Sequence, residues 1–187
     1  MKKTLFFIGV LAFSIACLTS CGDSSESKTK MTTIYTSNAT AEDTLIDNVT
    51  RLSGIGHNGQ FAYRTDSLKQ YAATAIYQIH DTLINSDLRV NINYWVKASN
   101  PIKGDGLALS MQDNQTTFLW RTFDLANYGA KSNEWINVVD SIDIHANQVL
   151  KSGMFFKFFG FNANKQAIID FDDINITIKK VENNTED

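Results

Sequence analysis

The chain has 187 residues, with 17 Lys and Arg against 20 Asp and Glu, and its formal net charge is −3. This balance disfavours nucleic acid as a partner, because nucleic-acid binding calls for a basic patch. The two cysteines, Cys17 and Cys21, both lie near the N-terminus, so the sequence predicts a folded domain without disulfides.

The N-terminal segment has the pattern of an export signal. Lys2 and Lys3 precede an apolar run over residues 5–18, which is too short to cross a bilayer and is typical of a secretory signal. The run ends in Leu18-Thr19-Ser20-Cys21, which resembles the lipobox of bacterial lipoproteins. The resemblance implies cleavage after residue 20 and acylation of Cys21. The alternative is a simple signal peptide with an incidental cysteine.

The predicted organisation has four parts: a signal peptide at 1–20, a polar flexible tether at 21–30, one domain at 31–180 and a polar tail at 181–187. Acidic residues after Cys21 loosely resemble the export signal of surface lipoproteins in Bacteroidetes-type bacteria. The expected location is therefore the outer membrane, with the lipid-anchored domain facing either the periplasm or the cell surface.

The sequence predicts an all-β domain, in which strand-like runs are separated by loops rich in Asn, Asp, Ser and Gly. Residues 31–35 are a possible first strand, and 51–59 concentrate turn residues. Further strands are predicted at 60–65, 72–79, 88–98, 107–112, 117–125, 135–144, 154–161 and 168–178. Their number and spacing predict an antiparallel β-sandwich.

Period-two patterning assigns two faces to the strand at 88–97. Its apolar side chains alternate with a polar stripe that contains one large aromatic, made of Arg89, Asn91, Asn93, Trp95 and Lys97. The run at 154–159 is apolar at both parities. This run is either a central strand covered on both sides or a strand that contributes aromatics to a groove.

The closing stretch, 167–178, carries two carboxylates at the start of a strand. Counting back from Ile174 by twos places Asp172 and Asp170 on the buried side. A buried carboxylate needs a cation, a cluster of backbone amides, or a basic side chain as its partner. The same alternation predicts that the adjacent Asp172 and Asp173 point to opposite faces and cannot share a substrate.

With these strands placed, residues 52–178 resemble carbohydrate-binding modules of the galactose-binding-like jelly-roll type. The resemblance rests on the Gly56-His57-Asn58-Gly59 turn, the strand around Trp95, Trp135 at the start of a later strand, and the closing segment 169–174. It implies a concave sheet face on which aromatic rings stack on sugars while amides and charged groups bind hydroxyls.

On this resemblance the ligand-binding candidates are Arg89, Asn91, Asn93 and Trp95, together with Trp120, Arg121 and Tyr128 on a neighbouring strand and loop. The alternative for Trp95 and Trp120 is a place in the core or under a loop. Trp135 is expected to pack under a loop.

The resemblance also implies a structural calcium ion, for which Asp172 is the matching ligand. Glu42, Asp43 and Asp47 lie in the region of the family's other acidic ligand, without a clear counterpart to it. The alternative for Asp172 is to cap a turn or to pair with Arg51 or Arg64.

The sequence shows no convergent catalytic groups, since His57, His80 and His145 are far apart, without metal-ligand spacing. A glycosidase built on this sandwich stays an alternative in principle, and two non-catalytic functions are favoured over it. The first is a membrane-anchored, non-catalytic lipoprotein that binds a poly- or oligosaccharide through a sheet face. The second is a structural lipoprotein that docks a protein partner in the cell envelope, with Trp95 buried.

Overall fold

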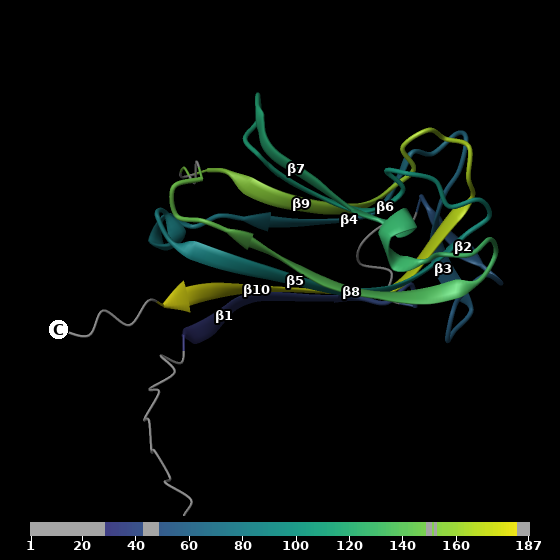
Figure 1. Cartoon of the computed structure of the whole chain (residues 1–187), viewed down its shortest axis with the longest axis horizontal. Helices are drawn as coiled ribbons and strands as arrows, with labels where there is room; N and C mark the ends of the chain where they lie inside the picture. The colour runs from purple at the N-terminus through teal and green to yellow at the C-terminus, as the bar shows by residue number, and fades with distance from the viewer. Residues whose placement is uncertain (1–28, 43–48, 149–150, 152, 183–187) are drawn as a thin grey trace, which may run out of the picture.

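The computed structural model describes residues 29–42, 49–148, 151 and 153–182. Two antiparallel sheets face each other and form a β-sandwich of the jelly-roll type (Figure 1). The strands are β1 (Lys30–Ala39), β2 (Arg51–Ser53), β3 (Phe61–Thr65), β4 (Tyr71–Gln78), β5 (Asp87–Ala98), β6 (Gly106–Gln112), β7 (Thr117–Asp124), β8 (Trp135–Ile144), β9 (Phe155–Phe161) and β10 (Ile169–Glu182). Two short 3-10 turns complete the elements, η1 (Asp81–Leu83) and η2 (Leu125–Tyr128).

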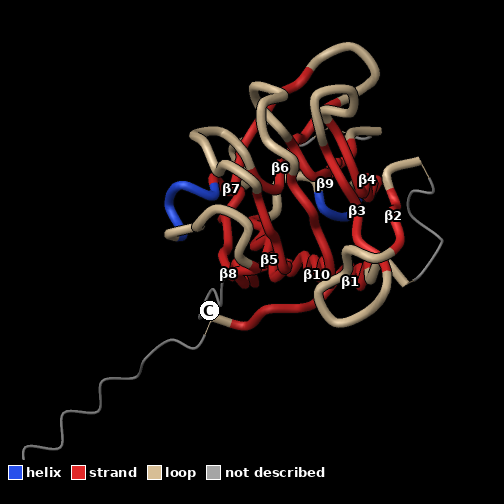
Figure 2. Tube along the Cα trace, turned by 90° about the vertical axis from the view of Figure 1, so that its right-hand side faces the viewer, coloured by secondary structure: helices blue, strands red, loops and turns tan. Residues whose placement is uncertain are grey.

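The long closing strand β10 organises the six-stranded sheet. The strand order is β2-β3-β10-β5-β8, and β1 pairs with the part of β10 that β3 leaves open. The four-stranded sheet has the order β4-β9-β6-β7. In the end-on view the four-stranded sheet lies above β8, β5, β10 and β1 (Figure 2).

The core lies between the sheets and is built by alternation along the strands. Val90, Ile92 and Tyr94 of β5 point inward from one sheet, and Leu107 and Leu109 of β6 point inward from the other. The Tyr94 hydroxyl links the two sheets through hydrogen bonds. It donates to the Phe123 carbonyl at 3.3 Å and accepts from Leu107 N at 3.2 Å. Burial raises the pKa of Tyr94, so this hydroxyl stays protonated.

The predicted strands are confirmed to within a residue or two at most of their ends. β2 falls in the segment that was expected to be a turn, and β10 runs to Glu182, past the predicted start of the tail at 181. Cys21 and the signal peptide lie outside the described residues. In the described part of the chain, no helix has the length and apolar character needed to cross a membrane.

The parity assigned to the closing stretch is wrong, because β10 contains a bulge. Its register with β5 shifts between Asp172 and Asn175, and Asp173 has a φ of 49°. A bulge adds one residue and exchanges the faces of all residues beyond it. Ile169 and Phe171 therefore point into the core, as Ile174 does. Asp170 and Asp172 lie on the outer face, buried there by neighbouring side chains and a loop.

Candidate functional site

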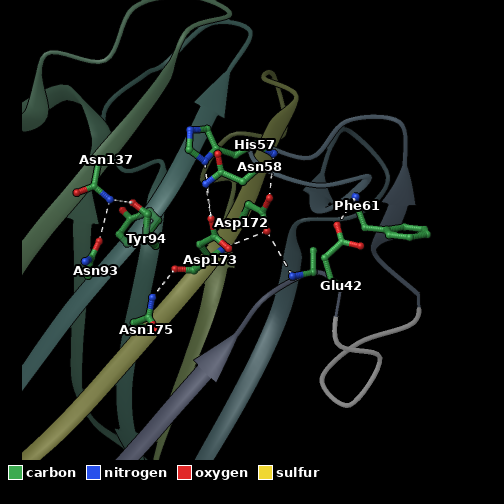
Figure 3. A network of polar contacts seen from close by, with 11 residues as sticks. Glu42, His57, Asn58, Phe61, Asn93, Tyr94, Asn137, Asp172, Asp173 and Asn175 are labelled. Atoms are coloured by element: carbon green, nitrogen blue, oxygen red, sulfur yellow. Dashed lines mark hydrogen bonds and ion pairs between the residues drawn. The ribbon is translucent and has the colours of Figure 1, made fainter.

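The polar stripe predicted on β5 lies on the outer face of the six-stranded sheet. Asn91 and Asn93 line a shallow depression of about 450 Å³, together with Val139 and Ser141 of β8 and Asn175 of β10. Asn137 of β8 donates to the Asn93 side-chain oxygen at 2.8 Å (Figure 3). This depression offers amides and a hydroxyl but has no aromatic ring in its lining.

Arg89 belongs to the same stripe and is engaged in an ion pair. Its guanidinium makes two bonds to the carboxylate of Asp143 on β8, at 2.7 and 2.8 Å. The bonded guanidinium lowers the pKa of Asp143. A ligand at Arg89 would have to compete with this carboxylate.

Trp95 lies under a loop, which was one of the alternatives to a ligand-binding role. The loop between β2 and β3 lays the imidazole of His57 on the indole of Trp95, with ring centroids 3.7 Å apart and planes inclined by 17°. The same imidazole meets Trp135 edge-on at 5.5 Å, in agreement with the expected packing of Trp135 under a loop. A sugar ring would have to displace His57 to stack on that face of Trp95.

Asp172 and Asp173 hold this loop together, and both face it. The carboxylate of Asp172 accepts from His57 N at 2.9 Å, Asp173 N at 2.9 Å and Ala41 N at 3.3 Å. The carboxylate of Asp173 accepts from the Asn58 side chain at 3.2 Å (Figure 3). The expectation that these two side chains diverge was wrong, because Asp173 itself lies in the bulge.

Among the described residues, the surroundings of Asp172 do not fit the calcium ion that the resemblance implies; Asp43 and Asp47 lie outside the described residues. Calcium takes six to eight oxygen ligands, whereas Asp172 receives three N–H donors, whose positive ends would repel a cation. The Arg51 guanidinium donates to the nearby carbonyls of Ala41 and Glu42. The Glu42 carboxylate accepts from Phe61 N at 3.0 Å (Figure 3). Among the described residues, no three or more His, Cys, Asp or Glu are grouped to hold a metal.

The remaining aspartate of β10, Asp170, is paired with two basic side chains. Arg64 binds its two carboxylate oxygens at 2.7 and 3.0 Å, and the Lys97 ammonium lies 3.3 Å away. The bond to Asp170 raises the pKa of Arg64. Arg64 is therefore the partner of Asp170, and the pairing of Asp172 with Arg51 or Arg64 is not observed.

Trp120 and Arg121 do not lie next to the β5 stripe. β7 belongs to the four-stranded sheet, whereas the strands beside β5 are β10 and β8. Tyr128 in η2 donates a short hydrogen bond to Asp140 of β8. Burial and this bond raise the pKa of Tyr128. The seven predicted ligand-binding residues are thus divided among two sheets and a turn, and they do not form one site.

A cluster of four aromatic rings does form on the outer face of the four-stranded sheet. We call it the aromatic platform, and its members are Tyr71 of β4, Phe159 and Phe161 of β9, and Trp120 of β7. Both Tyr71 and Trp120 contact both phenylalanines, with centroid distances of 5.3 to 5.6 Å. Tyr71 is 51% exposed and Trp120 is 48% exposed, while Phe159 is buried beneath them.

Polar groups extend the platform along β9. Lys157 points outward two residues before Phe159, with its ammonium 5.5 Å from the centre of the Phe159 ring. Beyond it lies a depression of about 280 Å³ lined by Ile76, Gln78, Asn114, Gly153 and Phe155. The hairpin of β6 and β7 bends away from the six-stranded sheet beside it (Figure 1). Across the outer face, flat rings are thus followed by an ammonium and then by two amide side chains.

Sequence reasoning missed Tyr71, Lys157 and Phe161 as site residues. The available signal was the run at 154–159, whose apolar residues at both parities were interpreted as either doubly covered or groove-forming. In the structure Phe156 and Phe158 enter the core while Phe159 supports the outer platform, so this central strand contributes aromatic rings to both faces of its sheet.

No protein-family model matches this sequence, and no curated protein matches it. Several solved structures are similar at low identity. A family 16 carbohydrate-binding module is 13% identical, with a TM-score of 0.39, covering 67% of this chain and 82% of its own. A xylan-binding domain from Paenibacillus barcinonensis is 15% identical, with a TM-score of 0.42 and coverages of 76% and 98%. A cyclase from Fischerella sp. is 10% identical, with a TM-score of 0.46 and coverages of 82% and 98%. Likenesses this distant specify neither a ligand nor an activity for this chain.

Proposed function

We propose that this chain is a non-catalytic glycan-binding protein whose binding surface is the aromatic platform. The observation that carries the proposal is the pair of half-exposed rings, Tyr71 and Trp120, both supported by the same two phenylalanines. Phe159 is buried beneath them and supports both rings.

The chemistry of the platform matches a sugar chain. The C–H faces of pyranose rings pack on flat aromatic rings, and the hydroxyls at the ring edge need planar amide partners. Gln78 and Asn114, both exposed, border the depression next to the platform and supply such amides. The non-catalytic part of the proposal rests on this content of rings and amides, since glycoside hydrolysis requires two carboxylates that flank the bond.

The platform replaces the β5 stripe as the candidate binding surface. On the six-stranded sheet, Trp95 is stacked by His57 and Arg89 is paired with Asp143. Asn91 and Asn93 remain available in their depression, but no ring beside them offers a stacking surface.

The proposal includes attachment to the outer membrane through acylated Cys21, on the strength of the lipobox-like Leu18-Thr19-Ser20-Cys21. Incorporation of labelled palmitate into the full chain, compared with Cys21→Ser, tests this part separately. Label in the wild type alone supports the anchor, and label in neither protein contradicts it.

A second candidate, docking of a protein partner, is favoured by the apolar edge of the same sheet. β4 is an edge strand, and both Ile76, 58% exposed, and Tyr71 project from it. Edge strands with exposed apolar side chains pair readily with other chains. An Ile76→Lys change would block such docking and leave the rings of the platform in place.

The test of glycan binding is affinity electrophoresis of the folded protein through gels containing a panel of neutral and acidic polysaccharides. Wild type is expected to be retarded by at least one polymer, and Trp120→Ala to lose about two- to tenfold in affinity, since an aromatic contact contributes roughly 0.5 to 1.5 kcal/mol. Trp95→Phe is the matched control and should be retarded as wild type. Retardation that Trp95→Phe abolishes and Trp120→Ala leaves intact would contradict the proposal.

A further inference from the structure

Lys157 places a positive charge beside the aromatic platform. Among the residues that the structure describes, no carboxylate forms an ion pair with it, and its one recorded contact is with the Phe159 ring. Its side chain is only partly exposed and stands on the central part of the face, between the platform and the 280 Å³ depression. By contrast, Lys30, Lys97 and Lys131 have carboxylate partners.

Apart from Asp124 at the end of β7, the outward positions of the four strands around Lys157 are uncharged. They carry rings, amides, hydroxyls and aliphatic groups: Tyr71, Ile76, Gln78, Ala108, Ser110, Gln112, Phe155, Phe159, Phe161, Trp120 and Thr122. Asp124 stands at the end of β7, and its carboxylate already accepts from Gly104 N and Ala126 N. The described outward positions therefore carry one positive charge, that of Lys157 in the centre, and one negative charge, that of Asp124 at the end of β7.

A second group on this face also lacks a partner. Ser110 of β6 lies opposite Trp120 on one side and Lys157 on the other, and its side chain is buried. Its hydroxyl makes no hydrogen bond in the described structure. A buried hydroxyl without a partner costs free energy, which an acceptor atom of a ligand would relieve once the covering side chains move.

We propose that the platform selects glycans that carry an anionic substituent, a carboxylate or a sulfate, on a sugar ring stacked against it. This inference rests on the proposed glycan-binding function and names the class of ligand for it. The Lys157 ammonium binds the anion, and the Ser110 hydroxyl, next to it, donates to one of its oxygens. The net charge of −3 opposes unspecific attraction of acidic polymers, so the selectivity must come from this local site.

The experiment compares matched pairs of polymers on the purified full chain in a detergent without a sugar headgroup. Polygalacturonate against its methyl ester isolates the carboxylate, and dextran sulfate against dextran isolates the sulfate. Wild type is expected to bind the acidic member of at least one pair about tenfold more tightly, because hydrogen bonds to charged groups are the strong ones. The preference should shrink as the salt concentration rises.

Two lysine variants make the test specific. Lys157→Gln should abolish the preference for the acidic member and leave binding of the neutral member unchanged. Lys179→Gln makes the same charge change on β10 of the other sheet and should behave as wild type. Equal binding of both members by wild type, or equal losses in the two variants, would overturn the inference while the platform still binds glycan. Binding that Trp120→Ala leaves unaffected would overturn the proposed function and this inference together.

Discussion

The imidazole of His57 stacks on the indole of Trp95, with centroids 3.7 Å apart, so a loop side chain occupies the place that a sugar would take on this tryptophan. The stacking is backed by the bond from His57 N to Asp172 at 2.9 Å. His57 thus covers one face of Trp95, whereas Tyr71 and Trp120 on the four-stranded sheet are about half exposed.

Removing the stacked imidazole should loosen the loop and expose Trp95. We expect His57→Ala to lower the free energy of unfolding by about 1 kcal/mol, the usual contribution of an aromatic pair, and to shift the tryptophan emission to longer wavelength. Urea denaturation followed by fluorescence measures both quantities. His145→Ala, on an exposed histidine without a ring contact among the described residues, is the control and should change neither.

The Asp172 carboxylate should be a structural anchor of the same loop. Asp172→Ala removes the acceptor of three backbone N–H groups, and we expect a loss of about 2 to 3 kcal/mol in the free energy of unfolding, because buried donors are left unpaired. Hydrogen exchange should show faster exchange at His57 N. An unchanged exchange rate at that amide would contradict the assigned role.

Chelation should leave the stability unchanged. Asp172 is satisfied by N–H donors, and the carbonyls of Ala41 and Glu42 accept from Arg51, so we expect the same Tm in EDTA and in millimolar calcium. Calorimetric scans of the full chain in EDTA and in calcium buffer measure this Tm. A Tm raised by calcium and lost in Asp172→Ala would show that a metal binds there after all.

The ion pair between Arg89 and Asp143 should contribute to stability only above acidic pH. The pKa of Asp143 is lowered in the folded state by Arg89, so its contribution is present above the unfolded pKa of about 4 and is lost as the pH falls through the folded pKa. Because both side chains are substantially exposed, Asp143→Asn should cost less than about 1 kcal/mol at pH 7. The difference between variant and wild type should vanish near pH 2; a constant difference from pH 7 to pH 2 would contradict it.

The strands could be predicted from the sequence, because alternation is a local property. The side chains of β5 alternate as expected from Leu88 to Lys97, and Arg89, Asn91 and Asn93 share the outer face. The prediction of inward and outward side chains failed in β10, where one extra residue in a bulge shifts the alternation. Asp173 adopts a positive φ at the bulge, a conformation that the sequence does not signal, and it moves Asp170 and Asp172 to the outer face.

The candidate site was harder to predict than the fold because sheet membership is not local. Trp120 was placed near the β5 stripe, yet β7 pairs with β6 in the other sheet. The platform joins Tyr71, Trp120 and Phe161 from three strands, and only the pairing of β4 with β9, of β9 with β6 and of β6 with β7 brings their rings together. No pattern within one strand encodes that arrangement.

The most direct measurement of the central claim is a fluorescence titration in which Trp120 is the sole tryptophan. The chain has three tryptophans, so Trp95→Phe combined with Trp135→Phe leaves Trp120, and the matched variant Trp120→Phe leaves the other two. We predict that a polysaccharide retained in gels changes the emission of the first variant saturably and leaves that of the second unchanged. A saturable response in the Trp120→Phe variant, with a silent Trp120, would contradict the claim that the platform is the binding surface.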